Sequence, residues 1–197
     1  MAQDEEPNGR LPEFLEGDAE SPEQGLSAPT SVNTRLVIPG NLLAETLAEL
    51  DLRSAGRRES AALLCGRVVN TDWIAEQVRF HHLLCNDRGR ALSMSLTENA
   101  KFTLYEELSR LGLRLVAAVH THPHDWVELS KIDQRNQICS RMGFWSIVVP
   151  WYGRHPWELS NMGVHILTAD GWKRLTIDQI RSNVQIEEMP WNHMSTE

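Results

Sequence analysis

Residues 113–133 constrain this chain more than any other segment. The segment opens with a largely apolar run that predicts a buried strand. His120 and His122 follow at the end of that run, and because successive side chains on a strand point to opposite faces, both imidazoles should project to the same side. Ser130 and Asp133 come after a short loop and lie three residues apart, so they should share the first turn of the next helix.

These positions predict a metal site. Two imidazoles and one carboxylate, arriving from a strand end and a helix start, form a zinc site whose fourth position stays open to water, which is the catalytic form. We therefore predict one Zn²⁺ per chain, bound by His120, His122 and Asp133. A second interpretation stays open, because Ser130 and Asp133 are also typical of a helix cap. Both roles can coexist, since a cap fixes the position of a ligand.

A hydrolytic zinc site also needs a carboxylate that accepts a proton and returns it to the leaving group. Glu59 is the candidate, because it opens an apolar, strand-like run over 59–69. The alternative is that Glu59 is a solvated strand end, and the sequence alone favours neither interpretation.

Taken together, these residues resemble a known family. Three features are similar to the signature of the JAMM metalloproteases, also called MPN+ or JAB domains. They are Glu59, the His-Thr-His-Pro stretch from His120 and, separated from that stretch by six residues, the Ser-x-x-Asp pair from Ser130. Leu64 and Gly66 match the segment that follows the glutamate in this family, whereas Ala62 stands where the family often has glycine. The resemblance covers roughly residues 34–176.

The resemblance implies both a fold and residue roles. The fold is a mixed α/β domain with a largely antiparallel sheet flanked by helices, related to the cytidine deaminase architecture. His120, His122 and Asp133 would be the zinc ligands and Glu59 the general acid and base. Ser130 would donate a hydrogen bond to the oxyanion that forms on the scissile carbonyl.

The length of the chain after the site narrows the implied function. Residues 134–143 leave no room for the zinc-binding insertion of linkage-specific family members, so the chain resembles the compact prokaryotic type. The resemblance then implies a zinc isopeptidase or peptidase that cleaves after the C-terminal tail of a ubiquitin-like protein, in precursor maturation or in deconjugation. E1-like or E2-like enzymes would be further partners. The alternatives are a sulfur-carrier-protein processing protease and a non-catalytic MPN scaffold, although such scaffolds typically lack the zinc ligands.

Two segments bear on substrate binding. Ala91, Ser93 and Ser95 alternate along the segment 86–96, which could add an extended substrate tail as a strand or be an ordinary loop. Trp126 could line the substrate groove or pack on the domain.

The charge of the chain divides it into parts. Residues 1–33 contain eight acids and one base, so they carry almost all of the formal net charge of −8. We predict a disordered acidic leader over 1–33, a JAB/MPN+ domain over 34–181 and a loosely ordered C-terminal tail over 182–197. The expected strands are 34–39, 59–69, 73–84, 113–119, 144–149, 163–168 and 172–175. The expected helices are 41–55, a second one that the capping-box signature Ser95–Glu98 opens and that ends at about residue 111, and 130–142.

Other function classes find little support in the sequence. There is no apolar span long enough for a membrane helix and no signal peptide, and the three cysteines form no C-x-x-C pair, so we expect a cytoplasmic protein with reduced thiols. No basic face indicates nucleic-acid binding. A zinc nucleobase deaminase would need His-x-Glu and Pro-Cys-x-x-Cys, and the sequence contains neither.

Overall fold

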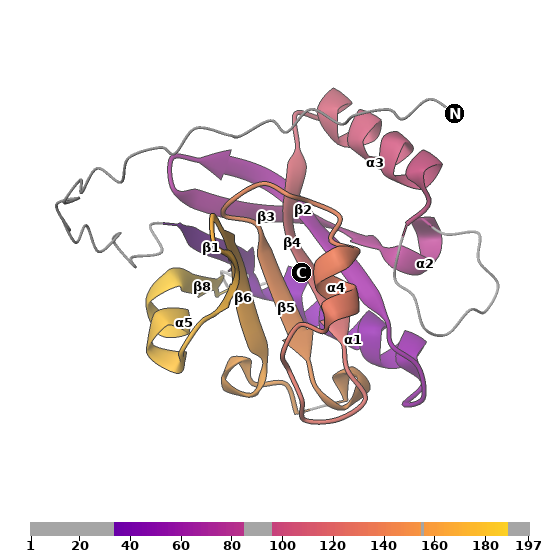
Figure 1. Ribbon diagram of the computed structural model, residues 1–197, viewed down its shortest axis with the longest axis vertical. Helices are drawn as coiled ribbons and strands as arrows, with labels where there is room; N and C mark the ends of the chain where they lie inside the picture. The colour runs from indigo at the N-terminus through magenta and orange to yellow at the C-terminus, as the bar shows by residue number, and fades with distance from the viewer. Residues whose placement is uncertain (1–33, 85–95, 155, 189–197) are drawn as a thin grey trace, which may run out of the picture. The chain divides into compact units, whose positions relative to one another are not determined.

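The computed structural model describes residues 34–84, 96–154 and 156–188. Within these ranges, eight strands form one sheet in the spatial order β7-β6-β5-β4-β2-β3-β1-β8 (Figure 1). The strands are β1 Arg35–Pro39, β2 Ala61–Val69, β3 Asp72–Phe80, β4 Arg114–Thr121, β5 Trp145–Val149, β6 Gly163–Thr168, β7 Gly171–Arg174 and β8 Val184–Glu187. The helices are α1 Gly40–Ser54, α2 His81–Leu84, α3 Glu98–Arg110, α4 Lys131–Arg135 and α5 Ile177–Asn183, with 3₁₀ turns η1 Trp151–Gly153 and η2 Leu159–Asn161.

The sheet is mixed, and β4 lies near its centre. β4 pairs antiparallel with β2 and parallel with β5, so its residues are shielded on both sides. The β2–β3 hairpin and the β5–β6–β7 meander are antiparallel, whereas β1 pairs parallel with both β3 and β8. The mixed α/β class expected from the sequence is confirmed, with parallel pairing at β4–β5 and on both sides of β1.

The core follows from the apolar runs of the strands and one face of each longer helix. Val116, Val119 and Ile147 on the central strands are completely buried. Leu47 and Leu50 bury the apolar side of α1 against the sheet, as the helical spacing predicts. Burial of each such side chain stabilises the fold by about 1.5–3 kcal/mol. The strand ends that carry the functional residues therefore continue directly from a well-packed core.

Several expected boundaries are wrong. The strand expected over 73–84 ends at Phe80 and is followed by α2, and the helix expected over 130–142 ends at Arg135. The N-cap of α3 is Thr97, two positions after the serine expected to open this helix, and the Thr97 hydroxyl accepts from the N–H of Ala100. The C-terminal tail expected from residue 182 includes the end of α5 and β8, which extends the sheet beside β1.

The remaining expectations about chain ends lie outside the described residues. These are the acidic leader over 1–33 and the last part of the tail from residue 189. In the part of the chain that the structure describes, Cys65 and Cys139 are free thiols. No helix of that part is long and apolar enough to cross a membrane.

Candidate metal centre

His120 and His122 lie where β4 ends beside β5. Both imidazoles are buried, with relative exposures of 5% and 3%, and their ring centroids are 5.0 Å apart. The N–H of His122 donates to the carbonyl of Val149 at 2.8 Å, and its own carbonyl accepts from the N–H of Tyr152 at 2.7 Å. These bonds hold His122 in extended backbone one residue past β4, so the alternation that aligns the two imidazoles is kept.

Asp133 reaches the two histidines from the first turn of α4. Its Oδ2 atom is 3.8 Å from Nε2 of His120 and 3.6 Å from Nε2 of His122. Ser130 caps the helix, because its Oγ accepts from the N–H of Asp133 at 3.1 Å while its own N–H donates to Asp133 Oδ2 at 2.8 Å. The two interpretations left open by the sequence therefore coincide: the cap fixes the carboxylate that faces the imidazoles.

The hydrogen bonds of this trio leave Nε2 atoms available for a metal. Nδ1 of His122 donates to the carbonyl of Trp126 at 2.9 Å, which places the proton on Nδ1 and leaves Nε2 as a lone-pair donor. Within the described residues, Nε2 of His120 is buried without a hydrogen-bond partner. The three donor atoms lie within 4.8 Å of one another, and a buried unpartnered nitrogen is costly unless something binds it. The residues therefore fit a metal ion.

The charges of the trio agree with this arrangement. Burial alone would raise the pKa of Asp133, but His120 and His122 together hold that pKa far below its usual range. Burial would lower the pKa of His122, whereas Asp133, the Trp126 carbonyl and Glu59 raise it above its ordinary value. The carboxylate of Asp133 is thus ionised at neutral pH, as a metal ligand would have to be.

Glu59 lies next to the trio because Ser60 is hydrogen-bonded to Thr121. The N–H of Ser60 donates to Thr121 Oγ1 at 2.9 Å, and the N–H of Thr121 donates to the Ser60 carbonyl at 3.0 Å. Thr121 stands between the two histidines in sequence, so this pairing places Glu59 beside the imidazole side of β4. Glu59, His120, Ser130 and Asp133 all line one pocket.

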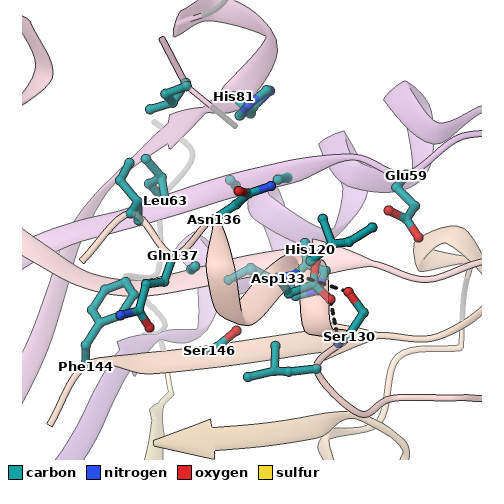
Figure 2. Close-up of a pocket in the computed structure, with 18 of the residues that line it drawn as sticks. Glu59, Leu63, His81, His120, Ser130, Asp133, Asn136, Gln137, Phe144 and Ser146 are labelled. Atoms are coloured by element: carbon teal, nitrogen blue, oxygen red, sulfur yellow. Dashed lines mark hydrogen bonds and ion pairs between the residues drawn. The ribbon is translucent and has the colours of Figure 1, made fainter. Parts of the chain in front are cut away.

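That pocket has a volume of about 340 Å³ and two chemically different ends. Figure 2 shows Glu59 and Ser130 at one end, His120 and Asp133 between, and Leu63 and Phe144 at the other. The floor of the pocket includes Leu63, Ala118 and Ser146, which are neighbours across β2, β4 and β5. Alanine and serine have small side chains, so they leave space above the sheet. The pocket is also lined by the apolar Leu96, Ile132, Ile138 and Trp172 and by the polar His81, Lys101, Asn136 and Gln137.

The backbone behind the histidines is held in an unusual conformation. Trp151 and Tyr152 both have positive φ angles, 53° and 59°. The N–H of Trp151 donates to the carbonyl of His124 at 3.1 Å, beside the bond from Tyr152 to His122. A non-glycine residue in this conformation raises the free energy of the folded state by about 1–3 kcal/mol and persists only where its surroundings enforce it. Here the strained residues are the ones whose N–H groups hold the backbone of the histidine segment.

The tentative substrate-binding residues have different outcomes. The ring of Trp126 stacks on His122 with centroids 5.2 Å apart and an interplanar angle of 17°, and half of the side chain is exposed. It packs on a metal-ligand candidate and is not among the described residues that line the pocket. Ala91, Ser93 and Ser95 lie outside the described residues.

Sequence reasoning missed the residues that shape the pocket. Ala118 precedes His120 by two positions, so strand alternation alone could have placed it on the same face. Ser146 gave no comparable signal, because its role depends on its register with Ala118 on β4.

Comparison with known proteins agrees with the fold. No family model matches the chain. A protein of Desulfitobacterium hafniense is similar in structure, with a TM-score of 0.55 and 16% sequence identity over 82% of this chain and 99% of that chain. A protein of Salinibacter ruber has a TM-score of 0.49 at 17% identity, covering 81% and 95% of the two chains. A JAB1/MPN domain protein from Archaeoglobus fulgidus has a TM-score of 0.43 at 17% identity, covering 76% and 97%.

At 16% sequence identity, the likeness to the Desulfitobacterium hafniense protein concerns the fold alone. The chemistry of the site depends on this chain's own residues. Those residues are a His-His-Asp group that could hold a metal, a capping serine and a carboxylate in one pocket.

Proposed function

We propose that this chain is a zinc-dependent peptidase of the JAMM type, which hydrolyses an amide bond after the C-terminal tail of a ubiquitin-like protein. The observation that carries the proposal is the Ser130–Asp133 cap, which holds a carboxylate against two buried imidazoles in the pocket that Glu59 also lines. A non-catalytic scaffold would need neither the unpartnered Nε2 of His120 nor a carboxylate in that pocket.

Each residue has a distinct task in this proposal. Zinc bound by His120, His122 and Asp133 would polarise the scissile carbonyl and lower the pKa of the attacking water. Glu59 accepts the proton released by that water and delivers it to the leaving amine. Ser130 Oγ already accepts from the N–H of Asp133, so its own O–H points elsewhere and can donate to the developing oxyanion.

The nature of the donor set favours zinc over harder cations. Two imidazole nitrogens with one carboxylate are typical of catalytic zinc, whereas Mg²⁺ and Ca²⁺ prefer oxygen ligands. The trio comes from β4 and the first turn of α4, which leaves the pocket side free for substrate.

The resemblance and the pocket support the proposed substrate class. If an extended tail reached the trio, the residues next to the cut bond would lie in this cavity, where Leu63 and Phe144 offer apolar contacts. A sulfur-carrier protein has the same kind of C-terminal tail, so such a carrier is the alternative substrate. The two candidates share their chemistry and differ in the partner.

Cleavage of C-terminal fusions tests this function. Ubiquitin-like and sulfur-carrier proteins would each be fused to a reporter and incubated with the chain as purified, after chelation and after zinc is restored. We expect about one zinc per chain and cleavage that is lost on chelation and regained with zinc. Zinc binding without cleavage of either fusion would refute the substrate class, and absence of zinc binding would refute the peptidase.

Filling the pocket should separate substrate binding from metal binding. Ala118→Leu adds a branched side chain to the floor without replacing a ligand, so we expect kcat/KM to fall about tenfold or more while zinc affinity is unchanged. Overpacking should also cost about 1–3 kcal/mol of stability, which thermal unfolding would measure. Ala118→Ser is the matched control, since it keeps the floor small. Equal activity of the two variants would show that the substrate does not use this cavity.

A further inference from the structure

The geometry of the metal centre depends on the loop between His122 and α4. This loop must deliver Ser130 and Asp133 to the imidazoles, although it contains no regular hydrogen-bonded structure of its own. Its apolar side chains, Val127 and Leu129, are buried and pack on Val148 of β5. Apolar packing of this kind holds the loop down but is non-directional, so it does not by itself fix the position at which α4 begins.

Glu128, between those two apolar residues, supplies directional contacts. Its Oε2 lies 3.5 Å from Nε2 of His165 on β6, and its Oε1 accepts a hydrogen bond from the guanidinium of Arg174 on β7. Burial would raise the pKa of Glu128, yet Arg174 and His165 hold it below its ordinary value, so the carboxylate is ionised in both contacts. One side chain thus ties the loop to two strands, two residues before the cap of α4.

His165 has no evident role in the core other than this contact. It is 2% exposed, and burial lowers its pKa, so the imidazole is neutral near pH 7. A carboxylate can only accept, so Nε2 carries the proton, and within the described residues Nδ1 is buried without a partner. An apolar residue would pack in this position without that cost, so the contact with Glu128 is the feature that distinguishes a histidine here.

Gly163, two residues before His165, allows the loop to approach β6. A Cβ atom at this position would lie 1.9 Å from the carbonyl oxygen of Val127, closer than any side chain permits. The backbone of the loop therefore runs directly against β6, which brings Glu128 within reach of His165.

From these contacts we propose that His165, Glu128 and Arg174 form a clamp that positions the start of α4, and hence the carboxylate of Asp133, against the two histidines. The three are positioning residues, since they act through the loop and not on substrate. The proposal rests on the metal-binding role of the trio, but the clamp can be tested without metal.

The first test is amide hydrogen exchange of the full, metal-free chain, read by NMR at the N–H groups of Ser130 and Asp133. These two N–H groups make the reciprocal bonds of the cap, so their protection reports whether α4 begins in place. Glu128→Gln keeps the shape of the side chain and removes its charge, and we expect about tenfold faster exchange at both groups with the amides of β4 unchanged. Glu76→Gln, which removes the carboxylate of the 3.2 Å Arg67–Glu76 pair on the β2–β3 hairpin, is the matched control and should change neither group.

Zinc affinity provides the second readout. Glu128→Gln and Arg174→Gln should each weaken zinc binding about tenfold, and the double variant should be no weaker than either single one, because the contacts act as a unit. Arg174 is half exposed, so its variant should fold even if Glu128→Gln does not. Exchange rates at Ser130 and Asp133 that stay at the wild-type value in these variants would overturn the clamp. If the wild type binds no zinc, the peptidase fails while the exchange measurement still decides the clamp.

Discussion

Glu59→Gln is expected to reduce cleavage by about 100- to 10,000-fold while zinc remains bound. Glutamine has nearly the same shape as glutamate but cannot accept the proton, so the variant removes the acid–base step and little else. Glu59 lines the pocket without belonging to the His-His-Asp group, so metal affinity should not fall. Its negative charge helps to raise the pKa of His122, so its removal makes that imidazole easier to deprotonate, which favours metal binding.

Two measurements on the same samples check this prediction. The kcat/KM of a fusion substrate gives the loss of activity, and competition with a chelator gives the zinc affinity. Glu45→Gln, on the exposed side of α1 and outside the described lining of the pocket, is the control and should behave as the wild type. Retained activity in Glu59→Gln would assign the proton transfer to another group, whereas loss of zinc would make Glu59 a ligand.

The local geometry of the site could be predicted because it depends on two short-range rules. His120 and His122 share a side through strand alternation, and Ser130 and Asp133 share a turn through helical spacing. Both rules hold within a few residues, so tertiary contacts did not need to be known. The same is true of β6, whose expected bounds of 163–168 agree with the structure.

Features that depend on distant contacts could not be predicted. α4 ends at Arg135, seven residues before the expected end, because no described residue of this helix is buried, and packing of an apolar face is what extends most helices. β8 is a strand because it pairs with β1, which lies about 150 residues earlier in the chain. The contact between Glu128 and His165 likewise joins residues 37 positions apart.

Loss of His120 should have the largest effect on the metal itself. Zinc at a hundred times its Kd would stabilise the wild type by about 2.7 kcal/mol, which is roughly 5–10 °C in Tm for a chain of this size. His120→Ala leaves only His122 and Asp133, so we expect this zinc-dependent rise to disappear. In the metal-free state the substitution creates a cavity but also removes the buried, unpartnered Nε2, and the second effect offsets part of the first.

Leu115→Ala on the same strand separates metal binding from general destabilisation. Leu115 is a buried core residue of β4 and does not belong to the His-His-Asp group, so its truncation should cost about 2–5 kcal/mol both with and without zinc. Its Tm should therefore fall while the zinc-dependent rise persists, the reverse of the pattern expected for His120→Ala. A zinc-dependent rise that survives in His120→Ala would show that the ion binds elsewhere, and the peptidase would then lack its metal centre.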